Sequence, residues 1–127
     1  MIKAIKNGFY FNINGGKARK SMVLAEDVSK IILKASEIGG TYNLTDGNHP
    51  NFNQLSYLIA KQFNKKNIFN MPMFIAHFLS KIGDFIGLNF FNSYKLNKIV
   101  SDLTFDDSKA RKTLDWKPNS VIENIKI

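Results

Sequence analysis

The chain has 127 residues, of which 44% are hydrophobic and 11 are Phe, and it carries a formal net charge of +8. This length matches one ordinary domain, and the composition predicts a globular protein with a real core, not a disordered tail. The absence of cysteine excludes disulfides and thiolate metal sites, and we expect a cytoplasmic protein.

The positive charge could indicate a nucleic acid, an anionic membrane or an anionic substrate. Sixteen of the 18 basic residues are Lys, and they are spread along the chain. Abundant Lys, Asn and Ile is also the bias that AT-rich coding DNA produces, so we predict no nucleic-acid partner. The first 15 residues lack the apolar core of a signal peptide, and no apolar run approaches the ~20 residues of a transmembrane segment.

The first part of the chain predicts short strands and one helix. After an amphipathic segment, Met1 to Lys6, the alternation from Phe9 to Asn14 predicts a strand, and Asn14-Gly15-Gly16 predicts a turn. A basic cluster, Lys17 to Lys20, precedes an apolar run that we interpret as a strand, Met22 to Ala25. Together they resemble an anion-binding shelf.

A helix follows, with Asp27 as its predicted N-cap. Its apolar face holds Val28, Ile31, Ile32 and Ala35. Gly39-Gly40 ends this helix, and Thr41 to Thr45 has the composition of a further strand.

The second half is predominantly helical. Asn51 and Gln54 form a capping-box pattern at the start of one helix, which breaks at Asn64 to Asn67 before a short strand, Ile68 to Met71. Pro72 then opens a strongly apolar helix. We interpret that helix as a core or subunit-packing helix, with a surface facing lipid or a lipid-linked substrate as the alternative.

Three further segments complete the predicted elements. They are a helix over Asn92 to Leu103, a short helix capped by Asp106-Asp107-Ser108, and a last helical turn or two over Ser120 to Ile127.

Three sequence motifs carry a family resemblance. In chain order they are SMVLAEDVSKII, GTYNLTDG followed by the capped helix NFNQLSYLIAK, and LTFDDSKARKTLDWKP. In this order and spacing they resemble the C-terminal third of the extended short-chain dehydrogenases, the NAD-dependent sugar epimerase/dehydratase family that includes UDP-galactose 4-epimerase. The resemblance covers nearly the whole chain and implies one α/β region over residues 1–127.

The resemblance implies a nucleotide-sugar-binding region of a bacterial-type enzyme for surface polysaccharide, with a Rossmann part that holds NAD or NADP lying outside this chain. No Gly-rich dinucleotide loop follows a predicted strand, so we expect no cofactor binding and no turnover by the chain alone. Tyr57-x-x-x-Lys61 and Tyr94-x-x-x-Lys98 match the catalytic spacing of the family. Both follow landmarks that should come after the catalytic helix, and the abundance of Lys makes such matches common, so no catalytic residue is predicted.

The resemblance also indicates which residues bind the substrate, a nucleoside-diphosphate sugar. It implies that Lys20, with Arg19 beside it, contacts the diphosphate, and a solvated lysine at a strand end is the alternative. The family's Arg-Glu-Gly-Asp sequence is absent, and Lys95 or Lys98 is the candidate substitute. This departure fits enzymes that act on UDP-N-acetyl sugars or reduce 4-keto sugars at least as well as galactose epimerases.

Several other features of the sequence have simpler explanations. His49 and His77 have no partner ligands nearby in the sequence, so no metal site is predicted. A free-standing, non-enzymatic binding or interaction module is the competing class of function. If the Rossmann part is absent, the helix after Asp27 and the strand from Thr41 to Thr45 should expose their apolar faces, and we expect self-association through them.

Overall fold

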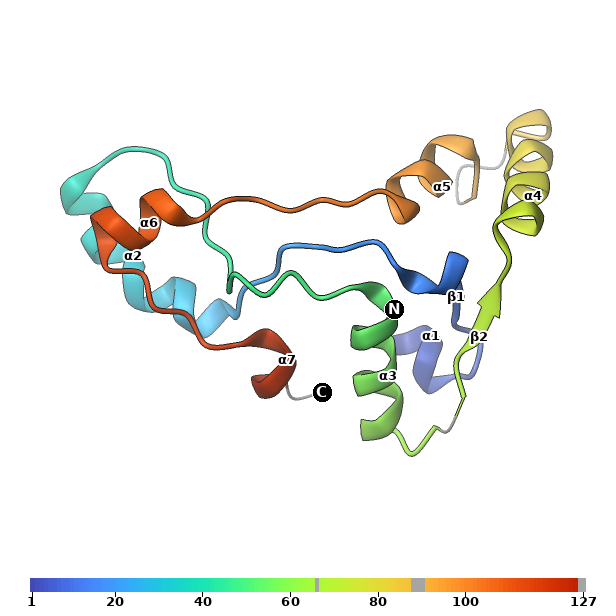
Figure 1. Ribbon diagram of the computed structural model, residues 1–127, viewed down its shortest axis with the longest axis horizontal. Helices are drawn as coiled ribbons and strands as arrows, with labels where there is room; N and C mark the ends of the chain where they lie inside the picture. The colour runs from blue at the N-terminus through green and yellow to red at the C-terminus, as the bar shows by residue number, and fades with distance from the viewer. Residues whose placement is uncertain (66, 88–90, 126–127) are drawn as a thin grey trace. The chain divides into compact units, whose positions relative to one another are not determined.

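The computed structural model describes residues 1–65, 67–87 and 91–125, which form a small mixed α/β protein (Figure 1). These residues contain seven α-helices, one 3₁₀ turn and a two-stranded parallel sheet, so the α/β class is confirmed at this level. The chain divides into two compact units. Unit 1 is Met1–Arg19 with Asn51–Asp102, and unit 2 is Lys20–Pro50 with Leu103–Ile127.

Unit 1 contains the sheet and four of the helices. Strand β1 (Phe11–Ile13) pairs in parallel with β2 (Phe69–Met71), with Phe11 opposite Phe69 and Ile13 opposite Met71. The helices are α1 (Ile2–Lys6), α3 (Phe52–Gln62), α4 (Met73–Phe85) and α5 (Ser93–Val100). The predicted capping box is confirmed at the start of α3, and Pro72 precedes α4 as predicted.

A buried amide joins the sheet to α3. The Asn12 side chain donates to Asn53 Oδ1 at 3.2 Å and to Ser56 Oγ at 3.1 Å. The predicted turn after β1 is a 3₁₀ turn, η1 (Asn14–Gly16), and Gly16 has a φ of +62°. A Cβ at Gly16 would come within 2.8 Å of the Asn12 side chain, so only glycine fits this turn.

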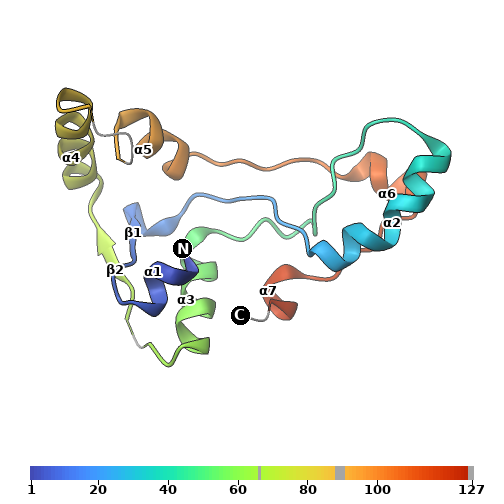
Figure 2. The same ribbon diagram turned by 180° about the vertical axis from the view of Figure 1, so that it is seen from behind.

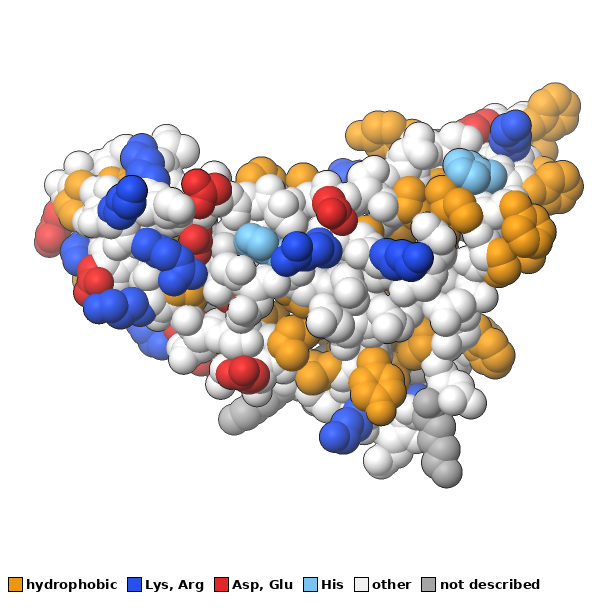
Figure 3. All heavy atoms as spheres, viewed as in Figure 1, with side chains coloured by type: hydrophobic (Ala, Val, Ile, Leu, Met, Phe, Trp, Pro, Cys, Tyr) orange, Lys and Arg blue, Asp and Glu red, His pale blue; other side chains and the backbone are white. Residues whose placement is uncertain are grey.

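Helix α4 packs on α5 through small residues, and the two helices lie side by side in both views (Figures 1 and 2). Ala76, Ser80 and Gly83 are its buried residues, and a Cβ on Gly83 would overlap the carbonyl oxygen of Phe91. The small residues of α4 therefore pack in the core as predicted, and subunit packing stays a prediction for most of its large side chains. These lie exposed, and Figure 3 shows hydrophobic side chains gathered over this helix.

Unit 2 contains α2 (Ala25–Ile38), α6 (Ser108–Leu114) and α7 (Val121–Asn124). Its core is Ala110, Leu114 and Trp116, against which partly buried side chains pack: Val23, Val28, Ile31, Ala35, Tyr42 and Leu44. The prediction that this face of α2 is uncovered is therefore wrong, because α6 and Trp116 cover it. Of the face residues named from the sequence, Ile32 is exposed.

Two predicted strands of unit 2 are not formed. The segments Met22 to Ala25 and Thr41 to Thr45 contain no strand, because they meet neighbours through single backbone hydrogen bonds and not a ladder. One such bond runs from the Asp46 amide to the Met22 carbonyl at 2.8 Å.

The start of α2 also differs from the prediction. The helix begins at Ala25 with Leu24 as its N-cap, so Asp27 does not cap it. Its carboxylate is buried and bonds elsewhere in unit 2. Lys66 in the predicted break after α3, and Lys126 and Ile127 at the end of the predicted last turn, lie outside the described residues.

Candidate functional site

The segment that begins at Lys20 is held between two other parts of unit 2. The Lys20 amide donates to the Pro50 carbonyl at 3.1 Å, and the Ser21 amide donates to the Leu103 carbonyl at 2.9 Å. The Lys20 side chain is half-buried. This fixes the backbone at the place where the sequence predicts a phosphate contact.

Ser21 links this segment to a histidine. Its hydroxyl accepts a hydrogen bond from the Phe105 amide at 2.8 Å and lies 3.0 Å from Nδ1 of His49. Which of the two groups donates depends on the tautomer of the imidazole. Sequence reasoning treated His49 as an isolated turn residue. The structure brings it beside Ser21, next in sequence to Lys20.

A cavity of about 320 Å³ opens along this segment. It lies entirely within unit 2, and its lining residues are Ser21, Met22, Val23, Tyr42, Asn43, Leu44, Thr45 and Phe105. Two of its polar side chains are fixed, because the Tyr42 hydroxyl donates to the Gly39 carbonyl at 2.8 Å and the Asn43 amide donates to the Asp106 carbonyl at 3.2 Å. A cavity with rings, aliphatic groups and fixed polar groups suits a small organic ligand.

Asp107 holds Thr45, one of the residues that line the cavity. The Asp107 carboxylate accepts two hydrogen bonds from Arg111, both at 2.9 Å, and one from the Thr45 hydroxyl at 3.3 Å. The hydrogen bond to Asp107 raises the pKa of Arg111 above its usual value. Both oxygens of the Asp107 carboxylate accept hydrogen bonds, and one of them holds Thr45. We therefore interpret the role of Asp107 as structural.

Two further buried carboxylates tie the C-terminal segment to the rest of unit 2. Asp46 accepts from the Val121 amide at 2.9 Å, and Asp27 accepts from the Asn119 amide at 2.7 Å. Hydrogen bonds from Lys30 and from the Asn119 backbone hold the pKa of Asp27 below its usual value. Both carboxylates therefore act as anchors for residues that follow α6.

Trp116 joins the segment after α6 to Thr45 and to the core of unit 2. Its indole N–H donates to the Thr45 carbonyl at 2.8 Å, and its ring packs in the core beside Leu114. The Trp116 and Asp107 contacts both end on Thr45, in the GTYNLTDG motif. SMVLAEDVSKII, GTYNLTDG and LTFDDSKARKTLDWKP therefore lie together in unit 2, whereas the capped helix of the second motif is α3 in unit 1.

The four predicted substrate-binding residues divide between the units. Lys20 belongs to unit 2, whereas Arg19 lies in unit 1, where its amide donates to Asp102 Oδ1 at 2.7 Å. Lys95 and Lys98 are exposed on α5, also in unit 1. Substrate binding by these residues stays a prediction.

The two Tyr-x-x-x-Lys matches lie on exposed helical surface. Tyr57 on α3 is 66% exposed, and Tyr94 on α5 is 74% exposed. The interpretation of both matches as accidental stays a prediction.

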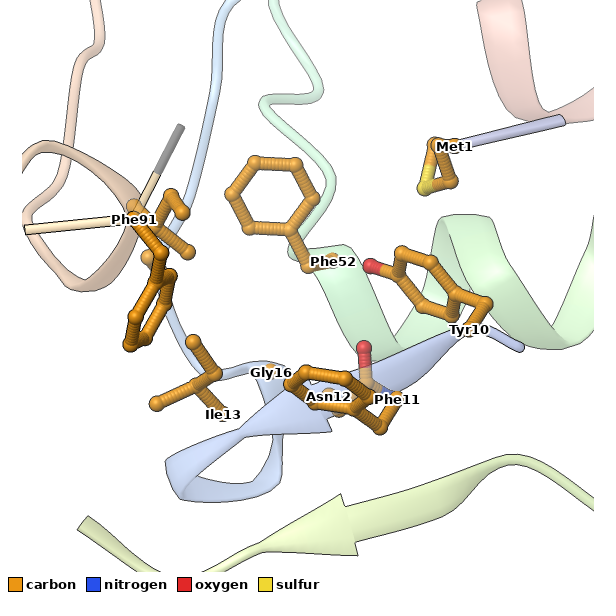
Figure 4. Close-up of a pocket in the computed structure, with 10 residues that line it drawn as sticks. Met1, Tyr10, Phe11, Asn12, Ile13, Gly16, Phe52 and Phe91 are labelled. Carbon is orange, nitrogen blue, oxygen red and sulfur yellow. The ribbon is translucent and has the colours of Figure 1, made fainter. Parts of the chain in front are cut away.

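Unit 1 contains a second cavity, of about 270 Å³, that the sequence analysis did not identify (Figure 4). Tyr10, Phe52 and Phe91 are arranged around it, and burial raises the pKa of the Tyr10 phenol. The clustered aromatic residues from Phe9 to Phe11 were the available signal, but they predicted only a strand. The full lining is Met1, Tyr10, Phe11, Asn12, Ile13, Gly16, Ala18, Phe52, Phe91 and Ile99.

Comparisons of the chain with protein-family models, with curated proteins and with solved structures gave no match. Among the residues that the structure describes, no three His, Asp or Glu side chains gather as a metal site. Within the same ranges no helix has the length and apolar character needed to cross a membrane. The family resemblance therefore stays a prediction carried by the three motifs.

Proposed function

We propose that the chain is the nucleotide-sugar-binding C-terminal region of an NAD(P)-dependent sugar epimerase, dehydratase or reductase that resembles UDP-galactose 4-epimerase. The assembly of GTYNLTDG with the first and third motifs in unit 2 carries this proposal. The Trp116 indole donates to the Thr45 carbonyl and so joins the third motif to GTYNLTDG. The Asp46 amide donates to the Met22 carbonyl and so joins GTYNLTDG to the first motif. Residues that serve one shared packing arrangement give a physical reason for the motifs to occur together.

In this proposal the chain binds the substrate. The Lys20 ammonium acts as a point charge for the diphosphate, and the adjacent cavity in unit 2 takes another part of the nucleotide sugar. Arg19, Lys95 and Lys98 belong to unit 1, and their contact with the substrate rests on the family resemblance alone.

The proposal assigns NAD or NADP to a Rossmann part outside this chain. The described residues do not fit a dinucleotide site of their own. Strand β1 runs into the 3₁₀ turn η1, and β2 is joined to α4 by Pro72 alone, without the glycines of a dinucleotide loop. We therefore derive no hydride-transfer step from these residues, and the region 1–127 contributes substrate binding only.

The second candidate is a free-standing, non-enzymatic binding module. The cavity in unit 1 favours it, because this apolar site is formed without Lys20. The reading frame upstream separates the two candidates, since a Gly-rich βα unit and a Tyr-x-x-x-Lys there would support the enzyme.

Titration of the ¹⁵N-labelled chain with UDP tests the proposal directly. We expect amide shifts between Lys17 and Val23, and we expect Lys20→Ala to weaken UDP binding by about 1.5–3 kcal/mol, the range for a charge-assisted hydrogen bond. Lys34→Ala is the matched control, because it removes the same charge from an exposed position on α2. Equal affinity of the Lys20→Ala chain, with shifts confined to other segments, would contradict the proposed phosphate contact.

The cofactor prediction has its own measurement. We expect no saturable NADH binding and no nucleotide-sugar conversion by the purified chain. Turnover with added cofactor would overturn the assignment of the cofactor site to a part outside the chain.

A further inference from the structure

Helix α4 has its large hydrophobic residues on the exposed side. Ala76, Ser80 and Gly83 form the buried face, whereas Phe74, Phe78 and Phe85 are 73%, 66% and 92% exposed. At 100° per residue these three rings fall within a sector of about 40°. An amphipathic helix of a globular protein normally buries such a stripe, so an exposed stripe of this kind indicates an interaction surface.

The charge of the protein is concentrated in the same unit. Unit 1 holds ten of the 18 basic residues and two of the ten acidic residues, whereas unit 2 holds eight of each. The net charge of +8 therefore belongs to unit 1 alone. Ten of the 11 Phe residues also fall in unit 1, so its apolar and basic residues occur together.

On α4 itself, the basic residue lies beside the exposed rings and the acidic residue is bonded to α5. Lys81 is exposed and lies within one helical turn of both Phe78 and Phe85, on the flank of the aromatic stripe. The acidic residue of α4, Asp84, accepts hydrogen bonds from the amide and hydroxyl of Ser93 at the start of α5. The carboxylate is thus directed to α5, while a cation accompanies the rings.

We propose that unit 1 binds the surface of an anionic lipid bilayer through α4. The rings of Phe74, Phe78 and Phe85 enter the boundary between headgroups and acyl chains, and Lys81 contacts anionic headgroups. With 13 residues α4 is about 20 Å long, too short for a hydrocarbon core of ~30 Å, so it lies in the plane of the interface. This inference goes beyond the proposed nucleotide-sugar function.

The charge of unit 1 favours a bilayer over a second copy of the chain as the partner. Two copies that joined through this face would bring together two units of net charge +8, and like charges oppose that contact. An anionic bilayer reverses the sign of the same interaction. Each Lys or Arg that reaches the bilayer surface adds to this attraction.

Vesicle co-sedimentation of the full chain tests the proposal. We expect binding to phosphatidylcholine vesicles that contain about one quarter phosphatidylglycerol, little binding to phosphatidylcholine alone, and weaker binding as salt shortens the Debye length. The variant F74S/F78S/F85S should lose about tenfold or more of the partition coefficient, because it removes the inserted area. Lys81→Glu should give a smaller loss that high salt removes.

A matched triple variant separates a specific surface from general stickiness. I32S/L33S/I38S removes three exposed hydrophobic side chains from α2 in unit 2 and should leave vesicle binding unchanged. Phe78→Trp adds a reporter, and its fluorescence should shift to the blue when anionic vesicles are added. Circular dichroism establishes that each variant is folded.

Three results would overturn the proposal. They are equal binding to neutral and anionic vesicles, equal loss of binding in the two triple variants, and no binding of the wild-type chain. Sedimentation equilibrium covers the competing partner: oligomers that F74S/F78S/F85S dissociates, without vesicle binding by the wild type, would assign the face to copies of this chain.

Discussion

The two units of this protein differ in their net charge and in where their large aromatic side chains lie. Unit 2 has no net charge and places its largest side chain, Trp116, at the centre of its core, with buried carboxylates fastening the surrounding segments. Unit 1 carries the whole net charge of +8, buries small residues of α4 and leaves large rings exposed. Both units have a buried hydrophobic core, and they differ in net charge and in the large rings that unit 1 leaves exposed.

The difference shows where substitutions should act. In unit 2 the informative changes alter the stability of the fold, because each anchor joins distant segments. In unit 1 the exposed rings can be removed at little cost to stability, since a side chain that stays in water contributes little to folding.

The largest expected effect is the loss of the ring at the centre of unit 2. Trp116→Ala leaves a cavity and removes the hydrogen bond to the Thr45 carbonyl, and we expect a loss of about 3–5 kcal/mol in the free energy of unfolding. Phe85→Ala in unit 1 is the control and should change stability by less than about 0.5 kcal/mol. Denaturant unfolding measures both, and similar losses in the two variants would remove the contrast between the units.

The second effect concerns the buried carboxylate of Asp27. Asp27→Asn should cost about 1.5–3 kcal/mol, because it removes the charge that Lys30 and the Asn119 amide and side chain hydrogen-bond. The pKa of Asp27 is lowered by folding, so this stabilisation is present above the ordinary value of 3.8 and is lost as the pH falls through the lowered pKa. Stability measured against pH should therefore fall less steeply in acid for Asp27→Asn, and parallel curves would refute the assignment.

Next comes the close contact between α4 and α5. Gly83→Ala would ordinarily stabilise a helix by about 1 kcal/mol. Here the added Cβ overlaps the Phe91 carbonyl oxygen, so we expect a loss of about 1–3 kcal/mol instead. Lys81→Ala on the exposed side of the same helix is the control, and a gain in stability from Gly83→Ala would contradict the described packing.

The smallest effect is expected at the exposed end of an ion pair. Lys30 contacts Asp27 at 2.8 Å, but its side chain is 67% exposed, and solvent screens such a pair. Lys30→Ala should therefore destabilise unit 2 far less than Asp27→Asn, in the same denaturation measurement. A loss equal to that of Asp27→Asn would mean that Lys30, and not the Asn119 contacts, stabilises the buried charge.

Local signals in the sequence predicted several elements correctly. Asn51 and Gln54 identified the start of α3, and Pro72 identified the start of α4, because caps depend on side chains within one turn. The strand after Phe9 was also predicted, although it is shorter than expected. The strands at Met22 to Ala25 and Thr41 to Thr45 were wrong, since β-rich composition does not show whether a neighbour offers a complete ladder.

The features missed at α2 and α4 share one cause. Periodicity shows which residues share a helix face, but not what that face meets. The apolar face of α2 was expected to be open, yet α6 and Trp116 cover it. In α4 the overlooked signal was the small-residue spacing of Ala76, Ser80 and Gly83, which allows α5 to approach closely. The candidate site was predictable only at Lys20, because the partnership of Ser21 with His49 depends on tertiary structure.

The bridge between Arg19 and Asn51 has a consequence for folding. The Phe52 amide donates to the Ala18 carbonyl at 3.2 Å, and both residues belong to unit 1. This contact holds the two ends of the segment Lys20–Pro50 close together. Closing a free loop of roughly 30 residues costs on the order of 3 kcal/mol in chain entropy. Once unit 1 is folded, this entropy is already lost, and unit 2 can form its core from a loop that is closed in advance.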